Sequence, residues 1–248
     1  MSIFVFLVGL CVGSFLNVVA SRWDSKDFWK GRSFCDHTGK KLPWYDNIPV
    51  LSYVMLLGKS RYSGKRISLQ YPLVEILTGV VFFAVYMKFS DILPMVVSFA
   101  IVSILIVIFI YDLHTKIIPD QLSYSFAILS LILLLINGNI WIWDILAGPI
   151  LFSPFAFLWI VSKGTWMGFG DAKLAWGIGW MLGLFGGINA IVISFWIGAI
   201  VGILLIALKK VVTFLPNSFS IKSEVPFAPF LVTATFLVFF FSINILIY

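Results

Sequence analysis

Long runs of apolar residues, separated by short polar breaks, occupy most of the chain. Each run approaches the length that a helix needs to cross a bilayer, roughly 20 residues. We expect spans near residues 2–20, 72–87, 92–111, 121–136, 140–161, 173–186, 188–208 and 227–247. One long polar stretch, residues 21–71, lies between the first two runs and is rich in Lys, Arg, Pro and Gly. The pattern predicts an all-α polytopic membrane protein with about eight transmembrane helices.

The composition agrees with this pattern. Of the 248 residues, 61% are hydrophobic and 11% are charged, and the mean hydropathy is +1.05. An ordinary soluble domain has about 25% charged residues, so that class is excluded. We divide the chain into a first transmembrane helix at residues 1–20, a cytoplasmic loop domain at 21–71 and a seven-helix core at 72–248. The expected partner is the lipid bilayer, and the net charge of +6 bears on topology rather than on nucleic acid.

The basic residues indicate how the spans are oriented. Lys and Arg collect in the cytoplasmic loops of membrane proteins. With eight spans and both termini outside the cytoplasm, every one of the 17 Lys and Arg residues except Lys88 falls on the cytoplasmic side. The sequence therefore predicts a multi-pass protein whose 21–71 loop faces the cytoplasm.

Two aspartates lie at the ends of predicted spans. Asp112 closes the third apolar run, and Asp171 follows two glycines in Gly168-Phe169-Gly170-Asp171, just ahead of the sixth. Acids in membrane segments are rare and commonly functional. The eight-span topology places both acids at cytoplasmic ends and at similar depth. We therefore predict that Asp112 and Asp171 meet in one site.

Two adjacent carboxyl groups can hydrolyse a peptide bond without a serine or a metal. Both cannot ionise cheaply, so one of them keeps a proton. The ionised acid can take a proton from water while the protonated acid polarises the peptide carbonyl, which is aspartic-protease chemistry. Gly168 and Gly170 permit unusual backbone angles and close approach of a substrate strand. Lys173 could balance the local charge.

Simpler explanations apply to each acid alone. An aspartate at a helix end is often a cap, and Gly-x-Gly in a membrane protein often serves helix packing. The matched depth of the two acids favours the catalytic interpretation. Asp120 follows Ile118-Pro119, which predicts a turn with Asp120 as the N-cap of the next helix. We do not expect Asp120 to be catalytic.

The two aspartates belong to an ordered set of motifs that covers nearly the whole chain. These are Gly13 to Val19 followed by Arg22, Trp44 to Tyr53, Gly64 to Ser68, Tyr71 to Gly79, Tyr111-Asp112-Leu113 with Ile117 to Asp120, and Gly168 to Asp171 with Lys173. Together they resemble the type IV prepilin peptidases, within the wider GxGD group of aspartic intramembrane proteases. In this resemblance Asp112 and Asp171 match the two catalytic aspartates.

The resemblance implies an enzyme of the bacterial inner membrane whose active site faces the cytoplasm. Such enzymes remove a short basic leader from type IV prepilin or pseudopilin substrates, just before the hydrophobic helix of the substrate. Many then methylate the new N-terminus with S-adenosylmethionine. For this second activity the resemblance suggests Glu75, Asn17, Arg22 and Asp46. Glu75 has an equally plausible structural role, as an ion pair or a helix contact.

The loop departs from the family pattern at a metal site. Many members carry two C-x-x-C pairs here, with the spacing of a four-cysteine zinc site. Cys35 matches the first position, but Thr38, Ser60 and Ser63 occupy the other three. One thiolate cannot hold a structural zinc, so we predict no metal.

Two other interpretations stay open from the sequence. The chain could be a peptidase without methyltransferase activity. It could also be a small ion-coupled membrane transporter, in which paired acids bind cations or relay protons. Transporters often contain internal repeats, and we find no convincing repeat between the two halves.

Overall fold

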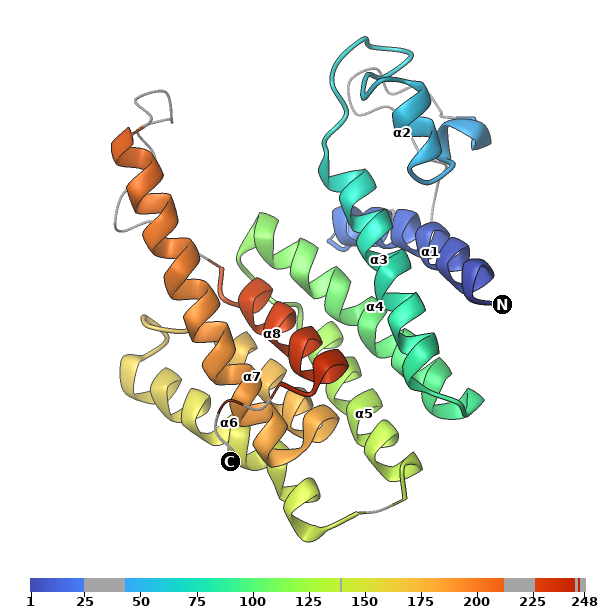
Figure 1. The fold of residues 1–248 in the computed structure, drawn as a ribbon. Coiled ribbons are helices and arrows are strands. Elements are labelled where there is room, and N and C mark those ends of the chain that lie inside the picture. Colours follow the sequence, from blue (N-terminus) through green and yellow to red (C-terminus); the bar gives the residue numbers. More distant parts are fainter. Residues whose placement is uncertain (25–42, 139, 212–225, 244, 246–248) are drawn as a thin grey trace. The chain divides into compact units, whose positions relative to one another are not determined.

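The computed structural model describes residues 1–24, 43–138, 140–211, 226–243 and 245, and within these ranges the regular elements are all helices (Figure 1). They are α1 (Ser2–Arg22), the short 3₁₀ helix η1 (Trp44–Asn47), α2 (Leu51–Met55), α3 (Gln70–Lys88), α4 (Ile92–Thr115), α5 (Asp120–Ile136), α6 (Ile142–Ser162), α7 (Phe169–Val211) and α8 (Ala228–Phe241). Five of the described helices are long and apolar enough to cross a membrane, and α5 and α8 are shorter apolar helices. The prediction of an all-α polytopic membrane protein is confirmed.

The chain forms two compact units, Met1–Val107 and Ile108–Tyr248, with the boundary inside α4. In the first unit, α1 packs closely against α3. A Cβ atom added at Gly9 would lie 2.8 Å from the Cα of Gly79, and one at Gly13 would lie 2.8 Å from the Cα of Glu75. Residue numbers thus rise along α1 as they fall along α3. The two helices run antiparallel, and the small residues let their backbones approach.

The second unit is built around α7, which consists of two helices joined at Gly183. Gly183 interrupts it with φ 72° and ψ 179°, which glycine adopts without steric cost. The chain reverses there, because a Cβ added at Gly187 would lie 3.6 Å from the Cα of Gly179, whereas eight residues along one helix span about 12 Å. We predicted the break between residues 186 and 188, and this boundary is wrong. The apolar run is continuous, so hydropathy does not mark the turn.

The first half of α7 is enclosed by its neighbours. A Cβ at Gly177 would clash with the Phe126 ring of α5, and one at Gly179 would lie 2.5 Å from the Ala147 carbonyl oxygen of α6. In the second half, Gly198 faces the Phe230 ring of α8. Figure 1 shows α6 and α8 beside α7. The first half of α7, which carries Asp171, is therefore packed by helices on more than one side.

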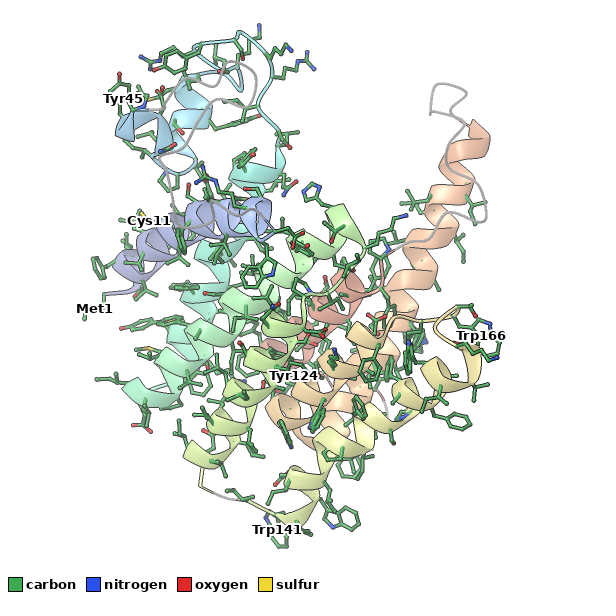
Figure 2. All side chains as sticks on the ribbon, turned by 180° about the vertical axis from the view of Figure 1, so that it is seen from behind. Met1, Cys11, Tyr45, Tyr124, Trp141 and Trp166 are labelled. Atoms are coloured by element: carbon green, nitrogen blue, oxygen red, sulfur yellow. The ribbon has the colours of Figure 1, made fainter. Side chains whose placement is uncertain are left out.

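Two exposed tryptophans mark the ends of α6. Trp141 immediately precedes α6 and is 73% exposed, and Trp166, in the connection to α7, is 74% exposed. Figure 2 shows both side chains pointing away from the second unit. The 21 residues of α6 span about 30 Å, the thickness of a bilayer core. Tryptophan is enriched at the membrane surface, so α6 has the length and the ends of a membrane-spanning helix.

Candidate active site

Asp112 lies in the last turn of α4 and is 4% exposed. Its carboxyl group accepts a hydrogen bond from the backbone N–H of Ala228, the first residue of α8. The first amides of a helix have no partner within the helix, and they favour negative charge. The other carboxyl oxygen, Oδ2, is buried and has no hydrogen-bond partner among the described residues. A buried polar atom without a partner is rare, and it marks a place where a substrate or water can bind.

Asp171 lies in the first turn of α7 and is 8% exposed. Its backbone N–H donates to the Gly168 carbonyl at 3.2 Å, and its carboxylate accepts the Gly168 backbone N–H. This is the acidic half of a capping box, in which the third helical residue reaches back to the amide before the helix. The helix start therefore fixes the direction of the acid.

The two aspartates come together within the second unit. The charge of Asp112 acts on the Asp171 carboxyl. Each acid also has one backbone N–H that holds one side of its carboxyl group. Two acids from different helices, both buried and held by backbone donors, form an arrangement suited to general acid–base catalysis.

The two glycines of the motif differ in their surroundings. A Cβ at Gly170 would lie 2.8 Å from the Cβ of Ile118 and within 3.2 Å of two further atoms of that side chain. At Gly168 the nearest non-neighbouring atom would be Asp171 Oδ2 at 3.7 Å, an ordinary contact distance. Neither glycine has a positive φ. Gly170 therefore allows the connection between α4 and α5 to lie against α7, whereas Gly168 leaves space beside the carboxylate.

Lys173 is buried, and its Nζ forms a 2.6 Å ion pair with Asp120 Oδ1. The prediction that Asp120 is an N-cap is wrong. The helix α5 begins at Asp120, its N-cap residue is Pro119, and there is no side-chain capping bond. The Asp120 carboxylate is directed to a residue that lies 53 positions away in the chain.

Sequence reasoning missed two contributors to this site. The Ala228 amide is a backbone group, so no side-chain motif identifies it, although Pro229 near the start of α8 is a typical helix-start signal. Asp120 was assigned to a local role because its partner is distant in sequence. Buried lysine requires a counter-charge, and this requirement could have directed the search from Lys173 to Asp120.

Asn17 and Glu75 lie in the packing between α1 and α3 of the first unit. Asn17 donates from Nδ2 to the carbonyls of Gly13 and Tyr71, at 3.3 Å and 3.4 Å, and its buried Oδ1 has no partner in the described part of the chain. The buried Glu75 accepts the Val50 N–H at 2.7 Å and a hydrogen bond from Ser14. Glu75 therefore joins the start of α2 to the helix pair.

Arg22 and Asp46 occupy other positions. Arg22 is the last residue of α1 and is half-buried. Asp46 lies in η1, with its side chain 5% exposed, and forms a 3.4 Å ion pair with Arg61, whose guanidinium also lies 5.4 Å from the centre of the Tyr45 ring. Asp46 therefore pairs with a residue of the same loop.

The described residues do not make a site for a methyl donor. The carboxylates of Glu75 and Asp46 are both directed to internal partners. Asn17 Oδ1 and Asp46 Oδ2 are buried acceptors without a partner among the described residues, and two acceptors alone do not bind S-adenosylmethionine.

A serine holds the loop turn at one of the positions where the family pattern has a cysteine. Ser60 Oγ accepts hydrogen bonds from the N–H groups of Tyr62 and Ser63, each at 3.4 Å. The Ser60 backbone N–H donates to the Lys65 carbonyl at 2.8 Å. Within the described ranges, no three or more His, Cys, Asp or Glu residues are placed to bind a metal. Cys35, His37 and Thr38 lie outside those ranges.

We expect Glu75→Ala to loosen the loop from the pair of helices α1 and α3. Val50 would lose the acceptor of its amide, and Val50 has φ 58°, a strained angle for a β-branched residue. A hydrogen bond to a charged group contributes about 1.5–3 kcal/mol. Limited proteolysis between residues 43 and 69 should become faster, and Glu75→Gln, which keeps an acceptor oxygen, should change it less. Unchanged proteolysis in Glu75→Ala would contradict the structural role.

The fold and this site together define a class of protein. A polytopic helical membrane protein with two buried, interacting aspartates from different helices has the parts of an intramembrane aspartic peptidase. Residues 99–203 match the model of the Type IV leader peptidase family, and residues 7–89 match the Bacterial Peptidase A24 N-terminal domain. The chain belongs to the type IV leader peptidase family, whose function is to cleave leader peptides from type IV prepilins.

Relatives from three bacteria carry the same name, prepilin leader peptidase/N-methyltransferase. The Xanthomonas campestris protein is 32% identical over 95% of this chain and 89% of its own length. The Myxococcus xanthus protein is 34% identical over 83% of this chain and 63% of its own length. The Vibrio cholerae protein is 31% identical over 72% of this chain and 76% of its own length. No solved structure gives a significant match. The family membership argues against the ion-coupled transporter.

Proposed function

We propose that the chain cleaves prepilin leaders with Asp112 and Asp171 as its two catalytic acids. The observation that carries the proposal is the buried and unpartnered Oδ2 of Asp112, in a carboxyl group that interacts with Asp171. An unsatisfied buried oxygen costs free energy, and a bound water or peptide group would supply its missing hydrogen bond. Either reactant of a hydrolysis, the water or the peptide, could thus bind at this atom.

In this mechanism the two acids share one proton. The ionised acid removes a proton from the attacking water, and the protonated acid donates to the carbonyl oxygen of the scissile bond. The Ala228 and Gly168 amides each hold one side of a carboxyl group, so both acids keep their direction while the proton moves. Burial excludes bulk water from the site and strengthens these electrostatic interactions.

The proposed substrates are type IV prepilins or pseudopilins. Three relatives are named prepilin leader peptidases, and the same names pair this activity with an N-methyltransferase. A substrate whose cleaved bond lies just before its hydrophobic helix would present that bond at the membrane surface. The position of Asp112 at one end of α4 and of Asp171 at the start of α7 agrees with such a bond.

We further propose eight membrane crossings, with the site on the cytoplasmic side of the bacterial inner membrane. The support is the reversal at Gly183, which divides α7 into two helices, together with the basic residues on one side of an eight-span topology. With both termini outside, the C-terminal end of α4 and the start of α7 face the cytoplasm.

This topology can be checked with cysteines that replace the tryptophans at the two ends of α6. In a background with Cys11→Ser and Cys35→Ser, Trp141→Cys is expected to react with a membrane-impermeant thiol reagent in intact spheroplasts. Trp166→Cys is expected to react only after the membrane is permeabilised. Both positions are well exposed, so differences in reaction report the side of the membrane. The opposite pattern would reverse the proposed orientation.

The catalytic proposal is tested by incubating a purified type IV prepilin with membranes that contain the parent protein or the double variant Asp112→Asn/Asp171→Asn. The parent should release the leader, and the double variant should not. The mass of the product N-terminus reports whether a methyl group has been added. Processing by the double variant at the parental rate would refute the aspartic mechanism.

A further inference from the structure

Lys173 is a buried cation, 6% exposed, in a site made by two helices. Besides the Asp120 carboxylate, its Nζ lies 5.0 Å from the centre of the Tyr124 ring and 4.9 Å from the centre of the Phe169 ring. Asp120 and Tyr124 are one turn apart on α5, so they face the same direction; Tyr124 is labelled in Figure 2. An ammonium group out of water needs such a counter-charge, and the aromatic rings add cation–π attraction.

This site connects directly to the turn that carries Asp171. Phe169 is the residue between the two glycines of the motif, and its ring packs against Trp159, with centroids 4.9 Å apart, and against Phe152 at 5.9 Å. The same ring covers Lys173 Nζ. The ion pair with α5 and the aromatic contacts with α6 thus hold one helical turn, the first turn of α7.

Lys173 does not share a helix face with the predicted catalytic acid. Residues two apart in a helix are separated by about 200° around its axis, so they do not face each other. The ion pair therefore holds the turn from the side away from Asp171. A further contact on this turn is made by Ile118, which packs against Gly170. The backbone between these contacts determines where the carboxylate of Asp171 lies relative to Asp112.

We propose that Asp120 and Lys173 form a positioning pair that places Asp171 for catalysis without contacting the substrate. The inference rests on the proposed function of Asp171. A displacement of about 1 Å in a catalytic group can lower the rate about 100-fold. The loss of either partner should therefore act on the chemical step and leave substrate binding almost unchanged.

The pair can be tested by steady-state kinetics of the full-length protein in lipid vesicles, with a type IV prepilin as substrate. Asp120→Asn and Lys173→Gln are each expected to lower kcat about 10- to 100-fold per folded enzyme, with KM changed by less than about twofold. The double variant should lose no more than the worse single variant, because both changes remove one interaction. Asp120→Glu and Lys173→Arg keep the charges and should recover most of kcat.

The matched control is Lys163→Gln, which removes an exposed cation from the same α6–α7 connection, and it should retain parental kcat. The folded fraction of every variant is measured by size-exclusion chromatography and thermal unfolding, so that kcat refers to folded protein. If kcat is recovered in Asp120→Glu but not in Asp120→Asn, the loss of activity comes from the missing charge and not from a change of side chain as such.

Three results would overturn the inference. The first is parental kcat in Asp120→Asn. The second is additive losses in the double variant. The third is a raised KM with kcat unchanged, where the rise in KM disappears for a prepilin whose leader lacks basic residues. This result would make Asp120, whose side chain is 64% exposed, a residue that binds the leader. If Asp171→Asn abolishes cleavage in the same assay, any of these outcomes refutes the positioning pair alone, whereas cleavage by Asp171→Asn refutes the proposed function as well.

Discussion

Asp112→Asn and Asp171→Asn are each expected to reduce prepilin cleavage by about a thousandfold or more, within the range typical of losing a general acid or base. Asparagine has nearly the same shape as aspartate, and its carbonyl oxygen can still accept the N–H of Ala228 or Gly168. The amide cannot accept and return the catalytic proton. Expression and membrane insertion should therefore stay near the parental level while activity is lost.

The measurement is the fraction of a type IV prepilin cleaved over time, at equal amounts of membrane-inserted enzyme. Asp144→Asn is the matched control, because Asp144 lies at the start of α6, where its carboxylate accepts the Trp141 N–H at 3.0 Å. This control should keep most of the activity. If either single variant at the proposed site cleaves at the parental rate, the shared-proton mechanism is wrong.

Gly170→Ala is expected to reduce both activity and stability strongly, and Gly168→Ala should reduce them much less. The new methyl group at residue 170 would approach Ile118 Cβ to 2.8 Å, so either the α4–α5 connection or the first turn of α7 must move. Overpacking of this kind costs about 1–3 kcal/mol, and the movement displaces Asp171. At residue 168 the methyl group would meet no atom closer than 3.7 Å.

Cleavage rate and thermal unfolding in detergent test the two glycines side by side. Ile118→Ala in the Gly170→Ala background should restore part of the activity, because it removes the contacts at 3.1 Å and 3.2 Å and leaves the Cβ contact. Equal losses of activity and stability in the two glycine variants would show that the close contact with Ile118 is not the reason for a glycine at residue 170.

Much of the fold could be predicted from the sequence, because bilayer thickness imposes a length on apolar segments. The ends of α3, α5 and α6 lie within a few residues of the predicted spans. The two spans on either side of the reversal were predicted, but the position of the reversal at Gly183 could not be found in the same way. It is made by one glycine with a positive φ inside a continuous apolar run, and it requires no polar loop that hydropathy would detect.

The candidate site was predictable to the extent that side-chain type reveals it. Asp112 and Asp171 stand out because acids are rare in membrane segments, and the structure brings them together. The Ala228 amide and the pairing of Asp120 with Lys173 depend on contacts between distant segments. Local patterns carry no information about such contacts. For Glu75, the sequence left two roles open, and the bond to Val50 favours the structural one.

The hydrogen bond from Ala228 to Asp112 has a consequence for biosynthesis. Its donor begins the last described helix, and its acceptor lies in the fourth. A nascent chain that has already delivered both aspartates into the membrane still lacks the amide that orients one of them. Proteolytic competence should thus arise only after the start of α8 has been synthesised, so a chain inserted only as far as α7 should be inactive.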